Sequence, residues 1–227
     1  MMDTDRIELI VLDLDGTLYD INDVISKVYQ YQVSFLSAKL NKPFHEIESF
    51  FASRGIYPVV SRNSRSATEL FAQLGVDNEE WKEYRNMHFD VTEIQIENAV
   101  GEEVINDLTM KRKVVLLSSN TMSTVEKILF HLDISKKFFS EIICSDNFHS
   151  ERGFNKRDAM KYISDKYNIP FSSMLSIGDR YQTDIRPMIE LGGVGVLITS
   201  PKNLMKVVKD LDCSRLMNCI EYELFRQ

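Results

Sequence analysis

Short runs of branched apolar residues recur along the chain, and most of them end in polar residues. The first run is closed by Asp13, and the fourth by Gly178 and Asp179. Consecutive apolar positions are typical of strands that are buried on both faces of a parallel sheet. The pattern predicts five such strands: Ile7–Leu12, Val114–Leu117, Glu141–Cys144, Met174–Ile177 and Val194–Ile198.

Segments with apolar residues three and four positions apart follow the second, third, fourth and fifth predicted strands. This spacing places the apolar side chains on one stripe of a helix. The predicted helices are Thr121–Leu132, Arg157–Tyr167, Ile185–Leu191 and Asn203–Leu211. Alternating strands and helices of this kind form right-handed βαβ units. The sequence therefore predicts an α/β fold with a doubly wound parallel sheet.

The stretch from residue 20 to residue 98 breaks this alternation, because it contains no convincing buried strand. Its apolar spacing predicts four helices: Val24–Leu40, Glu46–Ala52, Ser64–Leu74 and Glu79–Met87. Trp81 and the aromatic residues of these helices are expected to form their core. We interpret the stretch as a helical cap domain inserted after the first strand. The expected domains are a catalytic core of residues 1–19 and 99–227 and a cap of residues 20–98.

Composition narrows the classes of partner. The 227 residues carry a formal net charge of −7, which argues against non-specific binding to nucleic acids or anionic membranes. No apolar run approaches the ~18–20 residues that a transmembrane helix needs, and the acidic N-terminus does not resemble a signal peptide. Three scattered cysteines fit reduced thiols. We expect a cytoplasmic protein that has neither a membrane nor a nucleic acid as a partner.

Polar residues follow four of the predicted strands, at the edge where ligands bind in doubly wound sheets. Asp13, Asp15 and Asp179 would repel one another there unless a cation lay between them. A hard divalent ion with oxygen ligands fits this group, and Mg²⁺ is the usual choice. The other candidates at this edge are Ser118, Ser119, Asn120, Lys156 and Asp184.

Phosphoryl chemistry suits this set of side chains. One carboxylate can attack phosphorus and form a covalent intermediate, and a neighbouring carboxyl group can protonate the leaving oxygen and then activate water. Lys156 offers a point charge for phosphoryl oxygens, and the hydroxyl of Ser119 offers a neutral donor. Alternation along the strand lets only one of Ser118 and Ser119 face the site, and adjacency to Asn120 favours Ser119.

At this point the residues resemble the four motifs of the haloacid dehalogenase-like (HAD) hydrolase superfamily. The first motif is matched by residues 13–19 (DLDGTLY), and the second by Ser119-Asn120 after an apolar strand. Lys156 matches the third, although Arg157 follows it where the family commonly has proline. Residues 178–184 (GDRYQTD) match the fourth. The helical insert resembles the cap of the subgroup that includes phosphoglycolate phosphatase and β-phosphoglucomutase.

This resemblance implies a role for each matching residue. Asp13 would be the nucleophile, and Asp15 the general acid and base. Ser119, Asn120 and Lys156 would hold the phosphoryl oxygens.

The resemblance also implies a metal site. Asp13, the backbone carbonyl group of Asp15, and Asp179 would bind Mg²⁺. Asp184 would ligate the ion directly or support its ligands, and it is also a candidate N-cap for the helix predicted from Ile185.

The sequence thus predicts a Mg²⁺-dependent phosphatase that hydrolyses a small phosphorylated metabolite through an aspartyl-phosphate. A phosphotransferase or mutase of the β-phosphoglucomutase type and a non-catalytic phosphometabolite-binding protein are the alternatives. A dehalogenase is disfavoured, because that branch of the family does not need the second aspartate, here Asp15. The physiological substrate and the oligomeric state are left open.

Overall fold

The computed structural model describes residues 4–57, 68–90, 96, 98–148, 153–212, 216 and 222–226. The chain divides into two compact units. The α/β unit comprises Met1–Asp20 and Glu97–Gln227, and the helical unit comprises Ile21–Ile96.

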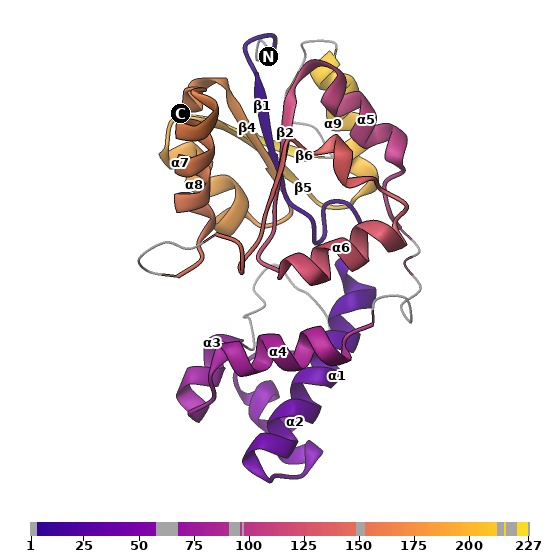
Figure 1. The fold of residues 1–227 in the computed structure, drawn as a ribbon, viewed down its shortest axis with the longest axis vertical. Coiled ribbons are helices and arrows are strands. Elements are labelled where there is room, and N and C mark those ends of the chain that lie inside the picture. The colour runs from indigo at the N-terminus through magenta and orange to yellow at the C-terminus, as the bar shows by residue number, and fades with distance from the viewer. Residues whose placement is uncertain are drawn as a thin grey trace. The chain divides into compact units, whose positions relative to one another are not determined.

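A six-stranded sheet forms the centre of the α/β unit, in the order β3-β2-β1-β4-β5-β6 (Figure 1). Its strands are β1 Leu9–Leu12, β2 Lys113–Leu117, β3 Glu141–Ile143, β4 Met174–Gly178, β5 Val194–Ile198 and β6 Tyr222–Phe225. The first five strands pair in parallel, and β6 pairs antiparallel with β5. The predicted α/β fold with a doubly wound sheet is confirmed, and β6 is an addition that the apolar pattern did not indicate.

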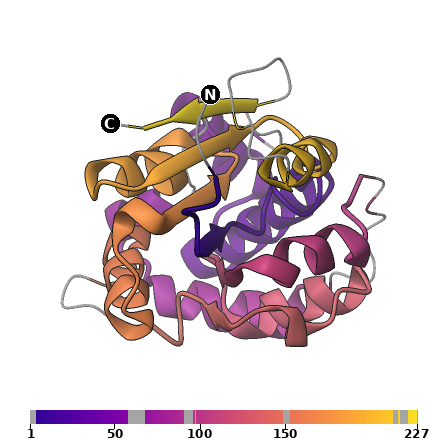
Figure 2. The ribbon, with the colours of Figure 1, turned by 90° about the horizontal axis from the view of Figure 1, so that it is seen from above.

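Helices cover both faces of this sheet. They are α5 Glu102–Lys111, α6 Met122–His131, α7 Lys156–Tyr167, α8 Arg186–Glu190 and α9 Lys202–Asp212. The views of Figures 1 and 2 show α7 and α8 on one face and α5 with α9 on the other. Short 3₁₀ turns precede β3 and β4, at Lys136–Phe138 and Phe171–Ser173. Helix α5 was not predicted from the sequence.

The central strands are apolar on both faces because helices bury both. Every residue of β1 and β4 is buried. Leu9 and Val11 of β1 pack in one cluster with Val115 of β2, Met174 of β4 and Ile163 of α7. Burial of this kind is the main stabilising contribution to such a sheet, and it fixes the register that brings the carboxyl ends of the strands to one edge.

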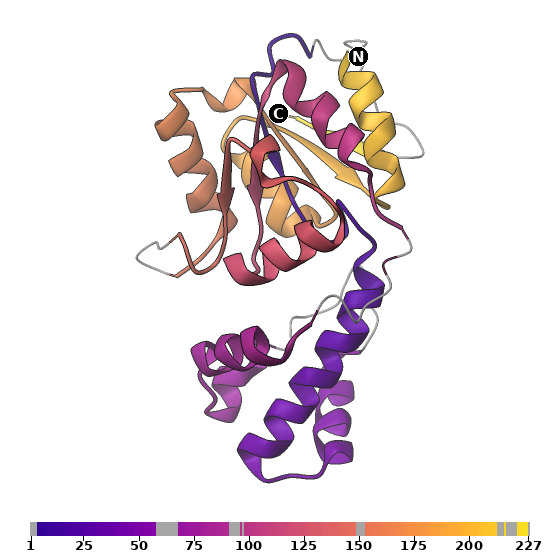
Figure 3. The same cartoon turned by 45° about the vertical axis from the view of Figure 1, so that its right-hand side comes forward.

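The helical unit has a core of its own. It contains α1 Ile21–Leu40, α2 Phe44–Ser53, α3 Thr68–Phe71, a 3₁₀ turn at Ala72–Leu74, and α4 Asn78–His88. Figure 3 shows α1 as its longest helix, with which α2 and α4 are in contact. Trp81 is buried and lies against Phe35 and Phe71, with ring centroids 5.6 and 5.8 Å apart. The prediction of Trp81 as a core residue is confirmed. Residues 64–67 of the predicted third helix lie outside the described residues.

Within the described part of the chain, none of the helices combines the length and the apolarity required to cross a bilayer.

Truncation of Leu9 to alanine tests the contribution of the central strand. Leu9 is fully buried in a cluster with residues of α7 and α8, so we expect Leu9→Ala to lower the free energy of unfolding by about 2 to 5 kcal/mol. Urea denaturation followed by circular dichroism measures this. The matched control is Phe130→Ala, because Phe130 is 82% exposed and its truncation should change stability by less than about 0.5 kcal/mol. Equal losses in the two variants would contradict this account of the core.

Candidate functional site

The first carboxylate of the site stands at the end of the central strand. Asp13 directly follows β1, and its backbone N–H continues the ladder by donating to the carbonyl oxygen of Ile177, 3.0 Å away. The loop then turns back, so that the Thr17 hydroxyl donates to Oδ2 of Asp13 at 3.3 Å. Both residues are buried, and only 6% of Asp13 is exposed. The carboxylate is therefore held in place at the edge of the sheet.

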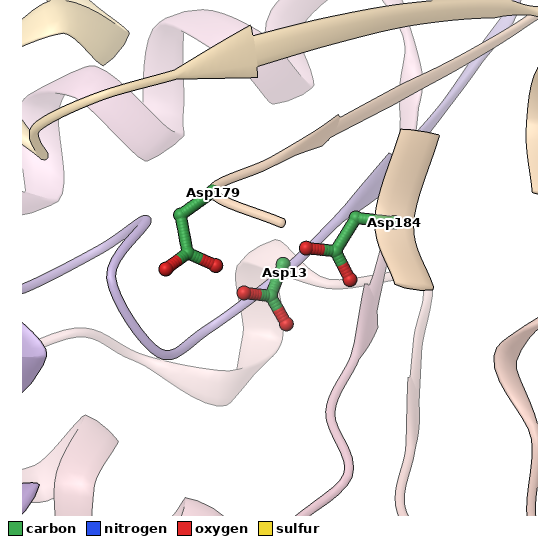
Figure 4. Close-up of side chains that lie close together, drawn as sticks. All are labelled: Asp13, Asp179 and Asp184. Carbon is green, nitrogen blue, oxygen red and sulfur yellow. The ribbon is translucent and has the colours of Figure 1, made fainter. Parts of the chain in front are cut away.

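Two further carboxylates come from the neighbouring strand. Asp179 follows the last residue of β4, and Asp184 lies in a turn of π-helix, Tyr181–Ile185, that leads into α8. One carboxylate oxygen from each of Asp13, Asp179 and Asp184 lies within 4.8 Å of the others. Figure 4 shows the three side chains pointing toward one another. They form what we call the carboxylate cluster.

Asp184 is the most firmly held member of this cluster. Its Oδ2 accepts a hydrogen bond from the backbone N–H of Arg180 at 2.9 Å, and its Oδ1 accepts one from the Thr183 hydroxyl at 3.1 Å. The N-cap of α8 is Ile185, and no side chain caps that helix. The suggestion that Asp184 caps it is therefore wrong. The π-helical turn explains why Asp184 is not the cap. This turn precedes α8 and directs the Asp184 carboxylate toward Asp13 and Asp179.

A lysine neutralises part of this negative charge. Lys156 is the first residue of α7, and its Nζ lies 2.5 Å from Oδ1 of Asp13 and 2.7 Å from Oδ1 of Asp184. The helix start is fixed by Asn155, whose Oδ1 accepts from the N–H of Asp158 at 2.8 Å and whose Nδ2 donates to its carboxylate. With 8% exposure, Lys156 is not a solvated lysine at a helix end.

Burial and mutual repulsion dominate the electrostatics of the cluster. Burial raises the pKa of Asp13 well above its ordinary value, and Asp184 and Asp179 raise it further while Lys156 opposes them. Burial and Asp184 likewise raise the pKa of Asp179 to about 6. Burial favours the neutral amine of Lys156, but Asp13 and Asp184 outweigh it and raise its pKa. Arg180 and Lys156 both lower the pKa of Asp179. Their two positive charges do not offset the three carboxylates of the cluster and that of Asp15, so the cluster has room for a further cation.

Asp15 lies beside the cluster and is held by two donors. The Tyr19 hydroxyl donates to its Oδ1, and Nδ2 of Asn120 donates to its Oδ2 at 2.6 Å. Tyr19 is fully buried, and burial together with Asp15 raises the pKa of its hydroxyl well above the ordinary value. Asn120 was predicted to contact phosphate, and in the structure its amide donates to Asp15.

The two serines after β2 face different surroundings. Ser118 is fully buried, and its Oγ accepts a hydrogen bond from the backbone N–H of Asn120 at 3.1 Å. Ser119 is exposed. Of the two serines, Ser119 therefore has the solvent-accessible side chain.

The carboxylate cluster fits a divalent cation. Oδ1 of Asp179 is buried and has no hydrogen-bond partner, although buried carboxylate oxygens almost always have one. Gly16 has a φ of 77°, and a Cβ at that position would collide with the carboxylate of Asp179. The loop therefore packs tightly against the Asp179 carboxylate on the side of Oδ2, while the other oxygen, Oδ1, lacks a protein donor. A hard cation bound by oxygen ligands would satisfy it.

The structure thus brings together Asp13, Asp179, Asp184 and Lys156, and it places Asp15, Ser119 and Asn120 around the same strand ends. Sequence analysis did not identify Thr17 as a contact of Asp13. Its position inside the DLDGT segment was the one available signal, since the turn that Gly16 allows returns the chain toward the strand end.

An α/β fold with a carboxylate and lysine centre at the carboxyl edge of its parallel strands defines the general class of the protein. A model of the haloacid dehalogenase-like hydrolase family matches residues 7–192. The match spans most of the chain, and the protein therefore belongs to this family of hydrolases. The comparison with curated proteins finds no match.

Solved structures agree with this assignment at the level of the fold. A HAD phosphatase from Thermococcus onnurineus gives a TM-score of 0.60 at 16% identity, over 89% of this chain and 98% of the other. A HAD hydrolase from Bacillus subtilis, solved bound to magnesium, gives 0.57 at 14% identity over 90% and 99%. A haloacid dehalogenase-like family protein from Streptococcus pneumoniae gives 0.56 at 16% identity over 90% and 91%.

Substitution of Gly16 tests the close packing of the loop over Asp179. We expect Gly16→Ala to weaken Mg²⁺ binding at least about tenfold, because the added Cβ must displace the Asp179 carboxylate. Isothermal titration calorimetry with MgCl₂ measures the affinity. Gly192→Ala is the matched control, since Gly192 has a φ of 94° with no atom near the added Cβ, so it introduces only backbone strain. Unchanged Mg²⁺ affinity in Gly16→Ala would contradict the packing argument.

Proposed function

We propose that the protein is a Mg²⁺-dependent phosphatase that hydrolyses a small phosphorylated metabolite through an aspartyl-phosphate on Asp13. The observation that carries this proposal is the carboxylate cluster, in which Lys156 forms an ion pair with Asp13. A cationic amine beside a carboxylate that is itself held at a strand end provides both an attacking oxygen and a partner for phosphoryl oxygens.

In the first step an oxygen of Asp13 attacks phosphorus, and the bond between phosphorus and the ester oxygen breaks. The leaving oxygen takes a proton from the carboxyl group of Asp15. During the transfer, the ammonium group of Lys156 offsets charge on the phosphoryl oxygens, and the hydroxyl of Ser119 donates a hydrogen bond to them. The products are the free alcohol and a phosphoryl group bound covalently to Asp13.

In the second step the carboxylate of Asp15 removes a proton from a water molecule, whose oxygen attacks phosphorus. The bond between phosphorus and the Asp13 oxygen then breaks. Inorganic phosphate leaves, the carboxylate of Asp13 is regenerated, and Asp15 holds the proton that it lost in the first step. The two steps therefore restore the enzyme and consume one water molecule.

The residues that would hold Mg²⁺ are Asp13, Asp179, the backbone carbonyl group of Asp15, and Asp184. Support comes from the partnerless oxygen of Asp179 and from the similar Bacillus subtilis HAD hydrolase, whose structure was determined bound to magnesium. When bound, the ion supplies positive charge that screens the phosphate from the carboxylates. Asp184 also orients Lys156, since the two side chains form an ion pair of 2.7 Å.

Two considerations favour attack at phosphorus over attack at carbon. Asp15 is present and held beside the cluster by two hydrogen bonds, as a leaving alkoxide would require. Lys156 is also available to pair with an anionic phosphoryl group. The helical unit follows the first motif directly, so we assign it the role of the cap that selects the substrate.

Replacement of the proposed nucleophile tests the reaction. We expect Asp13→Asn to reduce Mg²⁺-dependent hydrolysis of p-nitrophenyl phosphate at least about a thousandfold, because the amide does not attack phosphorus. Absorbance of released p-nitrophenolate measures the rate. Asp165→Asn is the control with the same chemical change, at an exposed position of α7.

Undiminished hydrolysis in Asp13→Asn would remove the nucleophile assignment. If the wild type releases no phosphate from p-nitrophenyl phosphate or from a broad panel of phosphorylated metabolites in the presence of Mg²⁺, the phosphatase proposal is wrong.

Loss of one metal ligand should change the Mg²⁺ requirement. We expect Asp179→Asn to raise the Mg²⁺ concentration for half-maximal activity about tenfold or more, since Asp179 offers the oxygen that has no protein partner. Activity measured across a Mg²⁺ titration, after treatment with EDTA, reports this. An unchanged midpoint would show that the ion lies elsewhere.

A further inference from the structure

Tyr19 contacts the proposed acid and base directly, although its side chain lies inside the protein. Its hydroxyl donates to Oδ1 of Asp15, while the side chain is fully buried. The other carboxylate oxygen of Asp15 accepts from Asn120. Two donors on the two oxygens of one carboxyl group fix both its position and the rotation of its plane.

The backbone around Tyr19 is held as well. Tyr19 forms isolated β-bridges with Asp15 and with Ala99. On either side of it, the N–H of Val100 donates to the carbonyl oxygen of Leu18 at 2.9 Å, and the N–H of Asp20 donates to that of Asn98 at 2.8 Å. A ring buried on a backbone with this many constraints has little freedom, so its hydroxyl presents a fixed donor to Asp15.

We infer that Tyr19 is a positioning residue for the general acid and base: its hydroxyl holds the Asp15 carboxyl group in the orientation that proton transfer requires. This inference rests on the proposed phosphatase function and adds a residue to it. The hydroxyl of Tyr19 contacts Asp15, and Tyr19 acts on the reaction through that residue. Displacement of a catalytic group by about 1 Å is enough to cost about a hundredfold in rate.

The leaving group distinguishes this role from a purely structural one. Phenyl phosphate has a poorer leaving group than p-nitrophenyl phosphate, so its transfer depends more on a well-placed acid. The value of kcat/KM reports the steps up to phosphoryl transfer for each ester. A variant with a displaced acid should therefore lose more activity on phenyl phosphate, whereas a partly unfolded sample loses the same fraction on both.

The experiment compares Tyr19→Phe with Tyr222→Phe, on full-length protein with Mg²⁺. Tyr222 is the matched control because it is also buried, and its hydroxyl donates at 2.6 Å to Asp210 of α9, which is not among the proposed site residues. Each variant loses one hydroxyl group and keeps its ring. Both esters are assayed on the same preparation. The fraction of folded enzyme therefore cancels when kcat/KM for one ester is divided by kcat/KM for the other.

For Tyr19→Phe we expect kcat/KM to fall about tenfold to a hundredfold on phenyl phosphate and only a few-fold on p-nitrophenyl phosphate. On p-nitrophenyl phosphate, kcat should fall by a larger factor than kcat/KM, so that KM falls as well, because Asp15 must also activate water for the second step. Tyr222→Phe should leave kcat/KM unchanged on both esters.

Equal losses on the two esters, no loss on either, or a selective loss in Tyr222→Phe would each overturn the inference while leaving the phosphatase proposal intact. Absence of Mg²⁺-dependent turnover of both esters by the wild type would instead overturn the phosphatase proposal, and the inference with it.

Discussion

The structure depends on the electrostatic balance at the carboxyl edge of the central strands. Asp13, Asp179 and Asp184 lie closer together than three unscreened carboxylates would remain. Lys156 pairs with two of them at 2.5 and 2.7 Å and offsets part of their repulsion. Burial and the repulsion that is left raise the pKa values of Asp13 and Asp179. In addition, one buried oxygen of Asp179 has no hydrogen-bond donor. A divalent cation would offset this remaining negative charge.

The rest of the α/β unit keeps these charges in place. Strands β1 and β4 are neighbours and are buried on both faces, so Asp13 and Asp179 leave the sheet side by side. The capped start of α7 fixes Lys156, and the π-helical turn directs Asp184 back toward the strand end. Hydrophobic burial thus supplies the free energy that holds like charges together, as strained or frustrated sites in proteins generally require.

Several parts of this arrangement could be predicted from sequence, and others could not. Runs of apolar residues revealed the five parallel strands because burial on both faces leaves a simple signal. Strand β6 gave no such signal, because it is a short antiparallel edge strand in which only Tyr222 is buried. The turn around Asp184 was misread as a helix cap, since local sequence does not distinguish a π-helical turn from an ordinary helix start. The hydrogen bond from Tyr19 to Asp15 depends on the return of the loop, which apolar periodicity does not encode.

The most direct test of the central claim is to locate the covalent intermediate. Wild-type enzyme is mixed with p-nitrophenyl phosphate and Mg²⁺ and quenched in acid within one turnover, and its peptides are analysed by mass spectrometry. The account predicts a phosphoryl group on Asp13, formed only when Mg²⁺ is present. A phosphoryl group on any other residue, or equal labelling of Asp13 after Mg²⁺ has been removed, would contradict it.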